Sequence, residues 1–364
     1  MSKFIEKFPV WEDFKKPVVL FGFFWYIFLT LVLTIFIGNF WAAVCFSLAA
    51  YSVIWNDAVQ TLMTYLHSNS DIPWKILYTW VSVVLLWVIW YWFLTNGWDI
   101  TYGRLEAKWY ADITVEWYFI FFPMILVFLT RFRGIPVSTS LLLLSIFASE
   151  LLFQKIVVKS MVGYLLAFGV AFLTWIIAEK ILAKRAENKK SEKVSDKKTI
   201  FWRAAQTITT ILLFSTWLMH DMVNIAVFLP KQLSFNVMLL ISAIFLIGLA
   251  YTFYIKWGPV GNIVTKKTST DQIVAATMID LIYFLILLIF KEWSNIPMST
   301  TWVFLWLLSW RQLAIRTINR IWVVAHNQRF KVAFKEIWKD FSKLMVGLGI
   351  SVLALIIMRY LTGS

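Results

Sequence analysis

The segments WNDAVQT (55–61) and GIPVSTS (134–140) are followed, in the second half of the chain, by MHDMVN (219–224) and NIPMSTT (295–301). In both halves an aspartate motif precedes a Pro-x-Ser-Thr motif, and long apolar segments lie beside them. The aspartate and the first serine are 81 positions apart in the first half and 78 in the second. Two different motifs that recur in one order at nearly one spacing indicate a duplicated unit. Acidic groups within apolar segments are costly, so their default interpretation is a functional site.

The composition predicts that the chain lies in a lipid bilayer. Of its 364 residues 60% are hydrophobic, 22 are Trp, and the mean hydropathy is +0.74. Several apolar runs exceed the roughly 20 residues that an α-helix needs to cross a bilayer. We therefore expect an all-α polytopic membrane protein, with aromatic side chains gathered at the two membrane interfaces.

Charge and cysteine content exclude several other classes. The formal net charge is +14, but the basic residues lie in loops beside the apolar segments, and no nucleic-acid-binding motif accompanies them. Cys45 is the only cysteine, so an intrachain disulfide is impossible. No metal-ligand spacing, phosphate-binding loop or nucleophile-elbow motif occurs. We accordingly expect no nucleic-acid partner, no enzyme activity and no cofactor.

Hydrophobic runs and helix breakers predict the order of the helices. Full spans are expected at 18–38, 40–66, 75–96, 159–182, 200–229, 235–256 and 344–361. Two pairs of apolar pieces are too short to span singly at about 1.5 Å per residue: 117–130 with 138–153, and 272–290 with 299–315. A proline separates the pieces of each pair, which predicts discontinuous helices folded into two re-entrant hairpins. The basic stretch 311–343 is predicted to be a helix on the membrane surface.

Charge asymmetry predicts the topology. Residues 1–182 form the first repeat with an N-terminal span, 183–199 a charged linker, and 200–364 the second repeat. With the N-terminus in the cytoplasm, most Lys and Arg fall on the cytoplasmic side, which satisfies the positive-inside rule. The two hairpins then enter from opposite sides, so the repeats have inverted topology. Such repeats with broken helices are typical of secondary transporters, and we expect a multi-pass protein of the plasma membrane, a bacterial inner membrane.

The hydroxyl runs predict an anion site. At the start of a half-helix, hydroxyl groups, free backbone N–H groups and the positive end of the helix dipole all favour an anion. Two such ends, one from each repeat, would hold a tetrahedral oxyanion near the membrane midplane. The alternative is that these side chains only cap helices or bond across them, and Ser138 is well placed to cap. The predicted substrate-binding residues are Ser138, Thr139, Ser140, Ser299, Thr300, Thr301, Gln60 and Asn224.

The acidic motifs predict a cation site. Hard cations such as Na⁺ take oxygen ligands, which carboxylates, hydroxyls and amides supply, and Gln60 and Asn224 offer such oxygens too. Asp57 and Asp221 are the candidates to bind Na⁺ directly, or to carry protons (H⁺) instead. The alternative is a pair of hydrogen-bonded acids that only stabilise a helix break. The predicted cation-binding residues are Asn56, Asp57, Thr64, His220 and Asp221.

Five further ionisable residues lie in or beside the apolar segments. Three of them have two interpretations each, and the other two are interpreted as peripheral. His220 occupies the position of the first asparagine in the second copy, where it either titrates and couples protons or is a neutral core residue. Arg131 and Arg133 either attract the anion or extend to the membrane interface. Glu150 and Asp280, also in apolar segments, are interpreted as lateral contacts.

The four motifs together resemble those of the inorganic phosphate transporter (PiT) family, which includes sulfate permeases. That family carries a duplicated Gly-Ala-Asn-Asp-Val-Ala-Asn-Ala signature, similar to 56–61 and 220–224 here. It also carries a duplicated Pro-[Val/Ile]-Ser-Thr-Thr-His signature, similar to 136–140 and 297–301. The resemblance implies an inverted-repeat fold with two hairpins, uptake of phosphate coupled to Na⁺ or H⁺, and often a homodimer. It also implies that the Asp, Asn, Ser and Thr positions of the motifs form the central site.

The chain departs from the family pattern within these motifs. The glycine before Asn-Asp is missing in both copies, Gln60 and His220 stand where the family has asparagine, and Ser140 replaces threonine. Leu141 and Trp302 stand where a histidine follows each hydroxyl run. Phosphate is therefore the first expectation for the substrate, and sulfate or a related oxyanion the second.

A hypothesis from another class is an intramembrane aspartyl hydrolase that uses Asp57 and Asp221 as an acid–base pair. The Gly-x-Gly-Asp and Pro-Ala-Leu signatures of such proteases are absent, and the hydroxyl runs have no role in them. A third hypothesis is a sensor of the same fold that transports nothing.

Overall fold

The described part of the chain is built of helices. The computed structural model describes residues 16–101, 103–105, 114–132, 135, 137–163, 165, 169–170, 196–256, 273–293, 299–305, 307–308 and 327–362. Its elements are α3 (Pro17–Ile37), α4 (Phe40–Val53), η1 (Ile54–Ala58), α5 (Val59–Ser68), α6 (Trp74–Thr95), η2 (Trp117–Ile120), α7 (Phe121–Val127), η3 (Phe128–Phe132), η4 (Ser140–Leu144), α8 (Ser145–Phe147), α10 (Asp196–Ala226), α11 (Phe235–Tyr254), α13 (Ile273–Trp293) and α15 (Asn327–Thr362). Two further helical segments cover 150–163 and 300–305.

Five of these helical segments are long and apolar enough to cross a membrane: Pro17–Ile37, Phe40–Ser68, Trp74–Thr95, Ile200–Ala226 and Phe235–Tyr254. Shorter apolar helices cover Trp117–Arg131, Ala276–Ile289 and Met345–Tyr360. Bulky apolar side chains of α3 point outward, as expected of a helix in contact with lipid; Ile35 is 78% exposed. The expected α-helical membrane protein is confirmed at this level.

Two boundaries in the second half differ from the expected ones. α15 continues without interruption from Asn327 to Thr362, so the boundary expected between the basic stretch and the last span at 343–344 is wrong. No proline occurs there, and each of its glycines costs an α-helix only about 1 kcal/mol. α10 begins at Asp196, inside the expected linker. An acidic residue in the first turn of a helix is stabilised by the helix dipole.

One boundary in the first half also differs. The piece expected at 138–153 ends with α8 at Phe147, and a new helix covers 150–163. Ser149 stands before this helix, and its hydroxyl oxygen accepts the Leu152 N–H at 3.3 Å. A serine cap of this kind starts a helix, so the break lies at a residue that the hydrophobic pattern alone does not distinguish.

The first aspartate motif lies in a widened helical turn. α4, η1 and α5 continue one another from Phe40 to Ser68, and Asn56 and Asp57 belong to η1, a π-helical turn. The helix is therefore widened locally by a π-turn and is not broken at the aspartate. Short π-turns within α-helices occur frequently at functional sites. η3 and η4 are π-turns too, and they hold Arg131 and Ser140.

Each predicted hairpin has limbs that contact one another. α7 packs against η4 in the first. In the second, the Tyr283 ring of α13 lies 5.4 Å from the Phe304 ring, centroid to centroid. The re-entrant character of the hairpins and the inverted relation of the two halves stay predictions.

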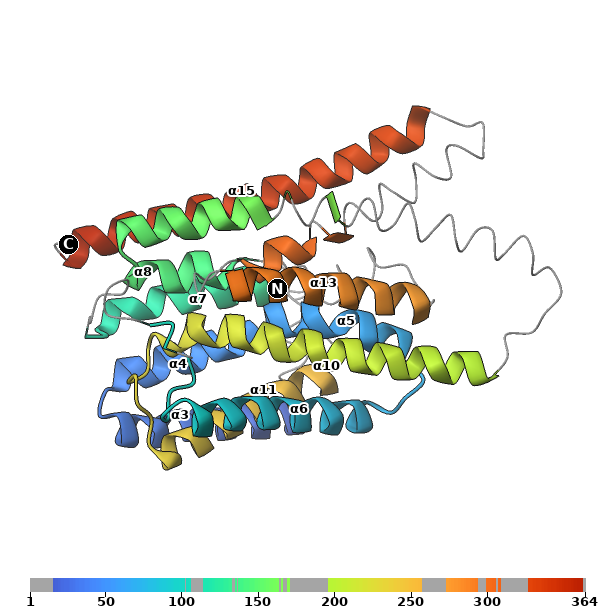
Figure 1. The fold of residues 1–364 in the computed structure, drawn as a ribbon. Coiled ribbons are helices and arrows are strands. Elements are labelled where there is room, and N and C mark those ends of the chain that lie inside the picture. The colour runs from blue at the N-terminus through green and yellow to red at the C-terminus, as the bar shows by residue number, and fades with distance from the viewer. Residues whose placement is uncertain are drawn as a thin grey trace.

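The elements that carry the motifs form the centre of the bundle. α10 packs along α13, α5 packs against both, and η4 contacts α10 and α15. Figure 1 shows α5, α10 and α13 side by side through the middle of the molecule, with α15 along its upper edge. This arrangement brings both aspartate motifs and both hydroxyl runs to the interior.

Several sequence predictions fall outside the described residues. They are the hairpin tips at 133–134, 136 and 294–298, most of the linker (183–195), the loop 258–271, the span residues 171–182 and the segment 309–326.

Gly248 of α11 generates a test of the packing around the first aspartate motif. A Cβ atom there would lie 2.5 Å from Cδ1 of Ile54, the first residue of η1. We predict that Gly248→Ala lowers the free energy of unfolding by about 1–3 kcal/mol relative to Gly349→Ala, which has open space around it. Ile54→Val removes the Cδ1 atom, so the cost should largely disappear in that background. Reversible unfolding in mixed micelles measures all four variants, and an equal cost in both backgrounds contradicts the prediction.

Candidate functional site

The first aspartate motif is bonded to residues from both predicted hairpins. Asp57 Oδ1 accepts the Thr301 hydroxyl at 2.5 Å and the Asn56 amide at 2.8 Å. The Asn56 amide also donates to the Val137 carbonyl at 2.6 Å, and Thr301 lies 3.2 Å from the same carbonyl. Gln60, one turn further along, donates to Asn56 Oδ1 at 3.0 Å. The first aspartate motif thus meets the second hydroxyl run and the backbone just before the first run.

Asp221 is bonded in a similar way. Its Oδ2 accepts the Thr300 hydroxyl at 2.9 Å, and its Oδ1 accepts the Asn224 amide at 2.7 Å. The same Asn224 amide donates to the Thr139 hydroxyl at 2.9 Å. Tyr283 of α13 donates to the Thr300 carbonyl at 3.0 Å, which fixes the second run against its own hairpin partner. The second aspartate motif therefore also contacts both hydroxyl runs.

The serines and the threonines of the hydroxyl runs have different roles. Ser138 Oγ accepts the Leu141 N–H at 3.2 Å, and Ser299 Oγ accepts the Trp302 N–H at 3.3 Å, so both serines cap their half-helices. The predicted Ser138 cap is confirmed. Because the serines hold the first turns, the threonines that follow them project to the acidic motifs. Ser140 is buried at the start of η4.

The meeting point of the motifs is fully enclosed by protein. Asn56, Asp221 and Asn224 have no exposed surface, and Asp57 is 2% exposed. Three acceptor oxygens there receive no hydrogen bond from the described residues: Asp57 Oδ2, Gln60 Oε1 and Asn224 Oδ1. Buried acceptors are usually satisfied, so such atoms indicate a place for a ligand. Their chemistry fits a hard cation, which takes carboxylate and amide oxygens.

Two of the predicted cation ligands, Thr64 and His220, bond to residues outside the four motifs. The Thr64 hydroxyl donates to Asp280 Oδ1, and the Thr210 hydroxyl donates to Asp280 Oδ2 at 2.9 Å. Asp280, interpreted from the sequence as a lateral contact, is thus the centre of a second buried acidic cluster that joins α5, α10 and α13. His220 Nε2 lies 3.2 Å from the Leu287 carbonyl, a contact that ties α10 to α13.

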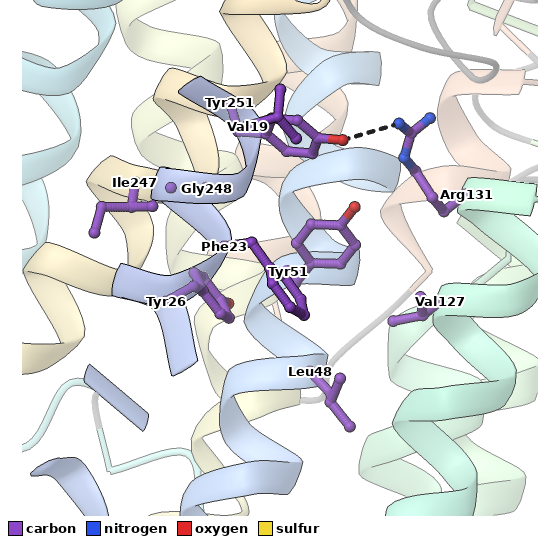
Figure 2. A pocket seen from close by; sticks show the side chains of 11 residues that line it. Val19, Phe23, Tyr26, Leu48, Tyr51, Val127, Arg131, Ile247, Gly248 and Tyr251 are labelled. Atoms are coloured by element: carbon purple, nitrogen blue, oxygen red, sulfur yellow. Dashed lines mark hydrogen bonds between the residues drawn. The ribbon is translucent and has the colours of Figure 1, made fainter. Parts of the chain in front are cut away.

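The two remaining candidates inside the described range differ in burial. Arg131 is 3% exposed, which is against its extension to the interface. Its guanidinium lies 4.2 Å from the Trp55 ring centroid. It also donates to the Tyr251 hydroxyl at 3.3 Å, as Figure 2 shows. Glu150 is on the surface and pairs with Arg359 at 3.3 Å, as a lateral contact would.

Two residues near the site were not predicted from the sequence. Ser160 of the helix 150–163 accepts the Ser299 N–H at 3.2 Å, and Tyr283 holds Thr300 as described above. A lone serine or tyrosine in an apolar helix gives no signal that separates it from a packing residue. Their roles become clear only from their hydrogen-bond partners in the folded chain.

Asp57 and Asp221 share no hydrogen bond in the described part of the chain. Each carboxylate accepts a hydroxyl from its own member of the adjacent pair Thr300 and Thr301. The acid–base pair of the hydrolase hypothesis needs a shared proton between close carboxylates, and this bonding pattern gives it no support. The described residues also hold no group of three or more His, Cys, Asp and Glu side chains suited to a metal ion.

Comparison with known proteins gives no further guide to the site: no protein-family model, curated protein or solved structure matches the chain.

The Asp280 cluster generates a second prediction. Thr210→Val removes the hydroxyl that donates to Asp280 Oδ2, and a buried acceptor without a donor costs about 1–3 kcal/mol of stability. Thr216→Val, on the same helix, removes a hydroxyl that bonds to the Leu212 carbonyl, and is expected to cost less than about 1 kcal/mol. Unfolding in mixed micelles measures the stability of both variants. Equal losses of stability would contradict the prediction, because the Asp280 contact would then contribute no more than a bond within one helix.

Proposed function

We propose that this protein is a secondary transporter for inorganic phosphate, coupled to Na⁺ or H⁺. The hydroxyl runs bind the anion and the acidic motifs bind the cation. One observation carries the proposal: all four duplicated motifs meet in one buried centre, through Thr301 with Asp57, Thr300 with Asp221 and Asn224 with Thr139. Motifs that each stabilised only their own helix would not be expected to converge at one centre.

The resemblance of the motifs to those of the PiT family supports phosphate as the substrate, with sulfate or a related oxyanion as the alternative. The same resemblance supports inverted repeats and a homodimer. The charge asymmetry of the loops supports residence in a bacterial inner membrane with the N-terminus in the cytoplasm.

The hydrogen bonds of the centre supply a mechanism of coupling. A threonine hydroxyl has one proton to donate, and the hydroxyls of Thr300 and Thr301 are donated to carboxylates. A cation or proton that neutralises Asp57 and Asp221 weakens these charge-assisted bonds. The threonine hydroxyls then become available to an oxyanion. Cation binding thus prepares the anion site, and the anion in turn offsets the cation charge.

Movement of the hairpins completes the transport cycle. In transporters with broken helices, one part of the structure rocks against another around a fixed site. Here the second hydroxyl run is joined to the aspartate motifs by side-chain bonds alone, which can exchange partners during such a movement. The backbone caps of Ser138 and Ser299 keep each half-helix intact meanwhile.

Uptake of labelled phosphate into proteoliposomes tests the proposal. Asp57→Asn and Asp221→Asn should each lower gradient-driven uptake by at least about tenfold, because the cation loses a charged ligand. Asp71→Asn is the matched control, since Asp71 pairs with Arg203 on the surface at 3.2 Å and should leave uptake unchanged. Runs with a Na⁺ gradient, a pH gradient and competing sulfate identify the coupling ion and the anion. If neither anion moves in folded protein under any gradient, the proposal is wrong.

The order of binding gives a sharper test. Binding of phosphate to the purified protein should require Na⁺ or low pH in the wild type. In Asp57→Asn/Asp221→Asn, phosphate binding should no longer need the cation, because neutral amides hold Thr300 and Thr301 less strongly than carboxylates do. Thr300→Val/Thr301→Val should weaken phosphate binding by at least about tenfold in every condition. Calorimetry measures each case, and a double asparagine variant that still requires the cation contradicts the mechanism.

A further inference from the structure

Asp280 of α13 is a buried carboxyl group outside the central site. It is 1% exposed, and its two oxygens accept the hydroxyls of Thr64 from α5 and Thr210 from α10, the second at 2.9 Å. Figure 1 shows these three helices side by side. The described part of the chain gives Asp280 no positively charged partner. A buried carboxylate that only hydroxyls compensate is costly, and a bound proton removes that cost.

Asp280 also shares no hydrogen bond or ion pair with another titratable side chain in the described ranges. On the helices packed together here, those side chains are Tyr65 and His67 of α5, Arg203, His220 and Asp221 of α10, and Tyr283 of α13 itself. Arg203 pairs with the exposed Asp71 at 3.2 Å instead. A proton is therefore the charge that Asp280 itself has to bind.

The hydrogen bonds of Thr210 leave a place for this proton. A threonine hydroxyl has one proton to donate, but Thr210 lies 2.9 Å from Asp280 Oδ2 and 2.8 Å from the Gln206 carbonyl. Both contacts are full hydrogen bonds at the same time only when Asp280 brings a proton of its own. A metal ion fits less well, because Thr64 and Thr210 direct their protons at the carboxyl oxygens.

A strip of polar side chains leads from Asp280 toward water. Gln206 lies one turn before Thr210 on α10, is fully buried and donates to the Ser68 hydroxyl at 2.6 Å. Ser68 is the half-buried last residue of α5, and the turn at 70–71 is exposed. In the proposed topology this end of α5 faces the cytoplasm. Water that enters the strip finds hydrogen-bond partners on the way to the carboxyl group.

We propose that Asp280 binds a proton while α13 packs against α5 and α10, and releases it toward the end of α5 when α13 moves. An ionised Asp280 favours water over the packed interior, so loss of the proton drives this movement. Tyr283, one turn after Asp280, donates to the Thr300 carbonyl and passes the movement to the second hydroxyl run. The proton site follows from its own geometry, whereas its part in the transport cycle rests on the proposed function.

Hydrogen exchange of the α13 amides in the purified full-length protein tests the proposal. In the wild type, exchange corrected for its intrinsic pH dependence should be at least about tenfold faster at alkaline than at acidic pH. Asp280→Asn carries no charge at either pH, so its exchange should be slow at both. Glu150→Gln removes a surface acid that pairs with Arg359 and should behave as the wild type does. Equal pH dependence in the wild type and Asp280→Asn overturns the proposal.

A second variant keeps the acid and removes one of its donors. In Thr210→Val the ionised carboxyl group loses a charge-assisted bond. The ratio of alkaline to acidic exchange should therefore rise above the wild-type value. Thr216→Val removes a hydroxyl that bonds within α10 and should leave the ratio unchanged. An unchanged ratio in Thr210→Val contradicts the assignment of the proton to Asp280.

Infrared spectroscopy detects the proton itself. In Asp57→Asn/Asp221→Asn, which lacks both central acids, acidification should still produce the band of a buried protonated carboxyl group. The further change Asp280→Asn should remove this band. A band that survives in the triple variant means that another acid binds the proton. Exchange of α13 that follows Na⁺ at constant pH, without a carboxyl band, means that Asp280 binds a metal ion, and either result overturns the proposal.

Uptake of phosphate into proteoliposomes separates this inference from the proposed function. In Asp280→Asn, uptake should no longer depend on the pH on the side of the α5 end. Unchanged dependence in a variant that transports means that the proton takes no part in the cycle, which contradicts that part of the proposal. If the wild type itself moves no anion, the proposed function fails, and the exchange and infrared results still decide whether Asp280 binds the proton.

Discussion

Two carboxylates in the centre of an apolar helix bundle are the constraint on which the rest of the structure depends. A buried charge is tolerated only where hydrogen bonds or opposite charges compensate it. Here Thr301 and Thr300 donate to Asp57 and Asp221, and Asn56 and Asn224 donate beside them. These donors come from segments that lie far apart in the sequence. The fold must therefore hold η1, α10 and the second hydroxyl run together, or the acids lose their hydroxyl donors.

The two copies of the motifs are similar in sequence, but they make different contacts in the structure. The second hydroxyl run bonds to both aspartates, whereas the first run meets the amides, through Thr139 with Asn224 and the Val137 carbonyl with Asn56. The helices differ too, because one aspartate lies in the π-turn η1 and the other in the α-helix α10. The paired motifs thus supply acids and hydroxyls twice, but the second hydroxyl run bonds to the acids, whereas the first run and the residue before it meet the amides.

The sequence predicted the parts of this arrangement that have a local signal. Long apolar runs located the spans, and serine before an apolar half-helix located the Ser138 cap, since both depend on neighbouring residues. The π-turns were not predicted, because an extra residue in a helical turn leaves no mark in composition. Thr64 was assigned to the cation site because it offers a hydroxyl oxygen close to the first aspartate motif in the sequence. It bonds to Asp280 instead, because the position of α13 beside α5 is set by long-range packing. The contact of Ser160 with Ser299 was not predicted either, because it also depends on long-range packing.

The π-turn η1 joins the acidic centre to the packing around Arg131. Arg131 lies over Trp55, and Trp55 directly precedes Asn56 and Asp57 in η1. η1 also contacts η3, the π-turn that holds Arg131. Gly248 of α11 leaves just enough room for Ile54 at the start of η1. Since packed interiors transmit strain and do not deform freely, a change of packing at Ile54 or Trp55 shifts Asn56 and Asp57 in the same turn as well.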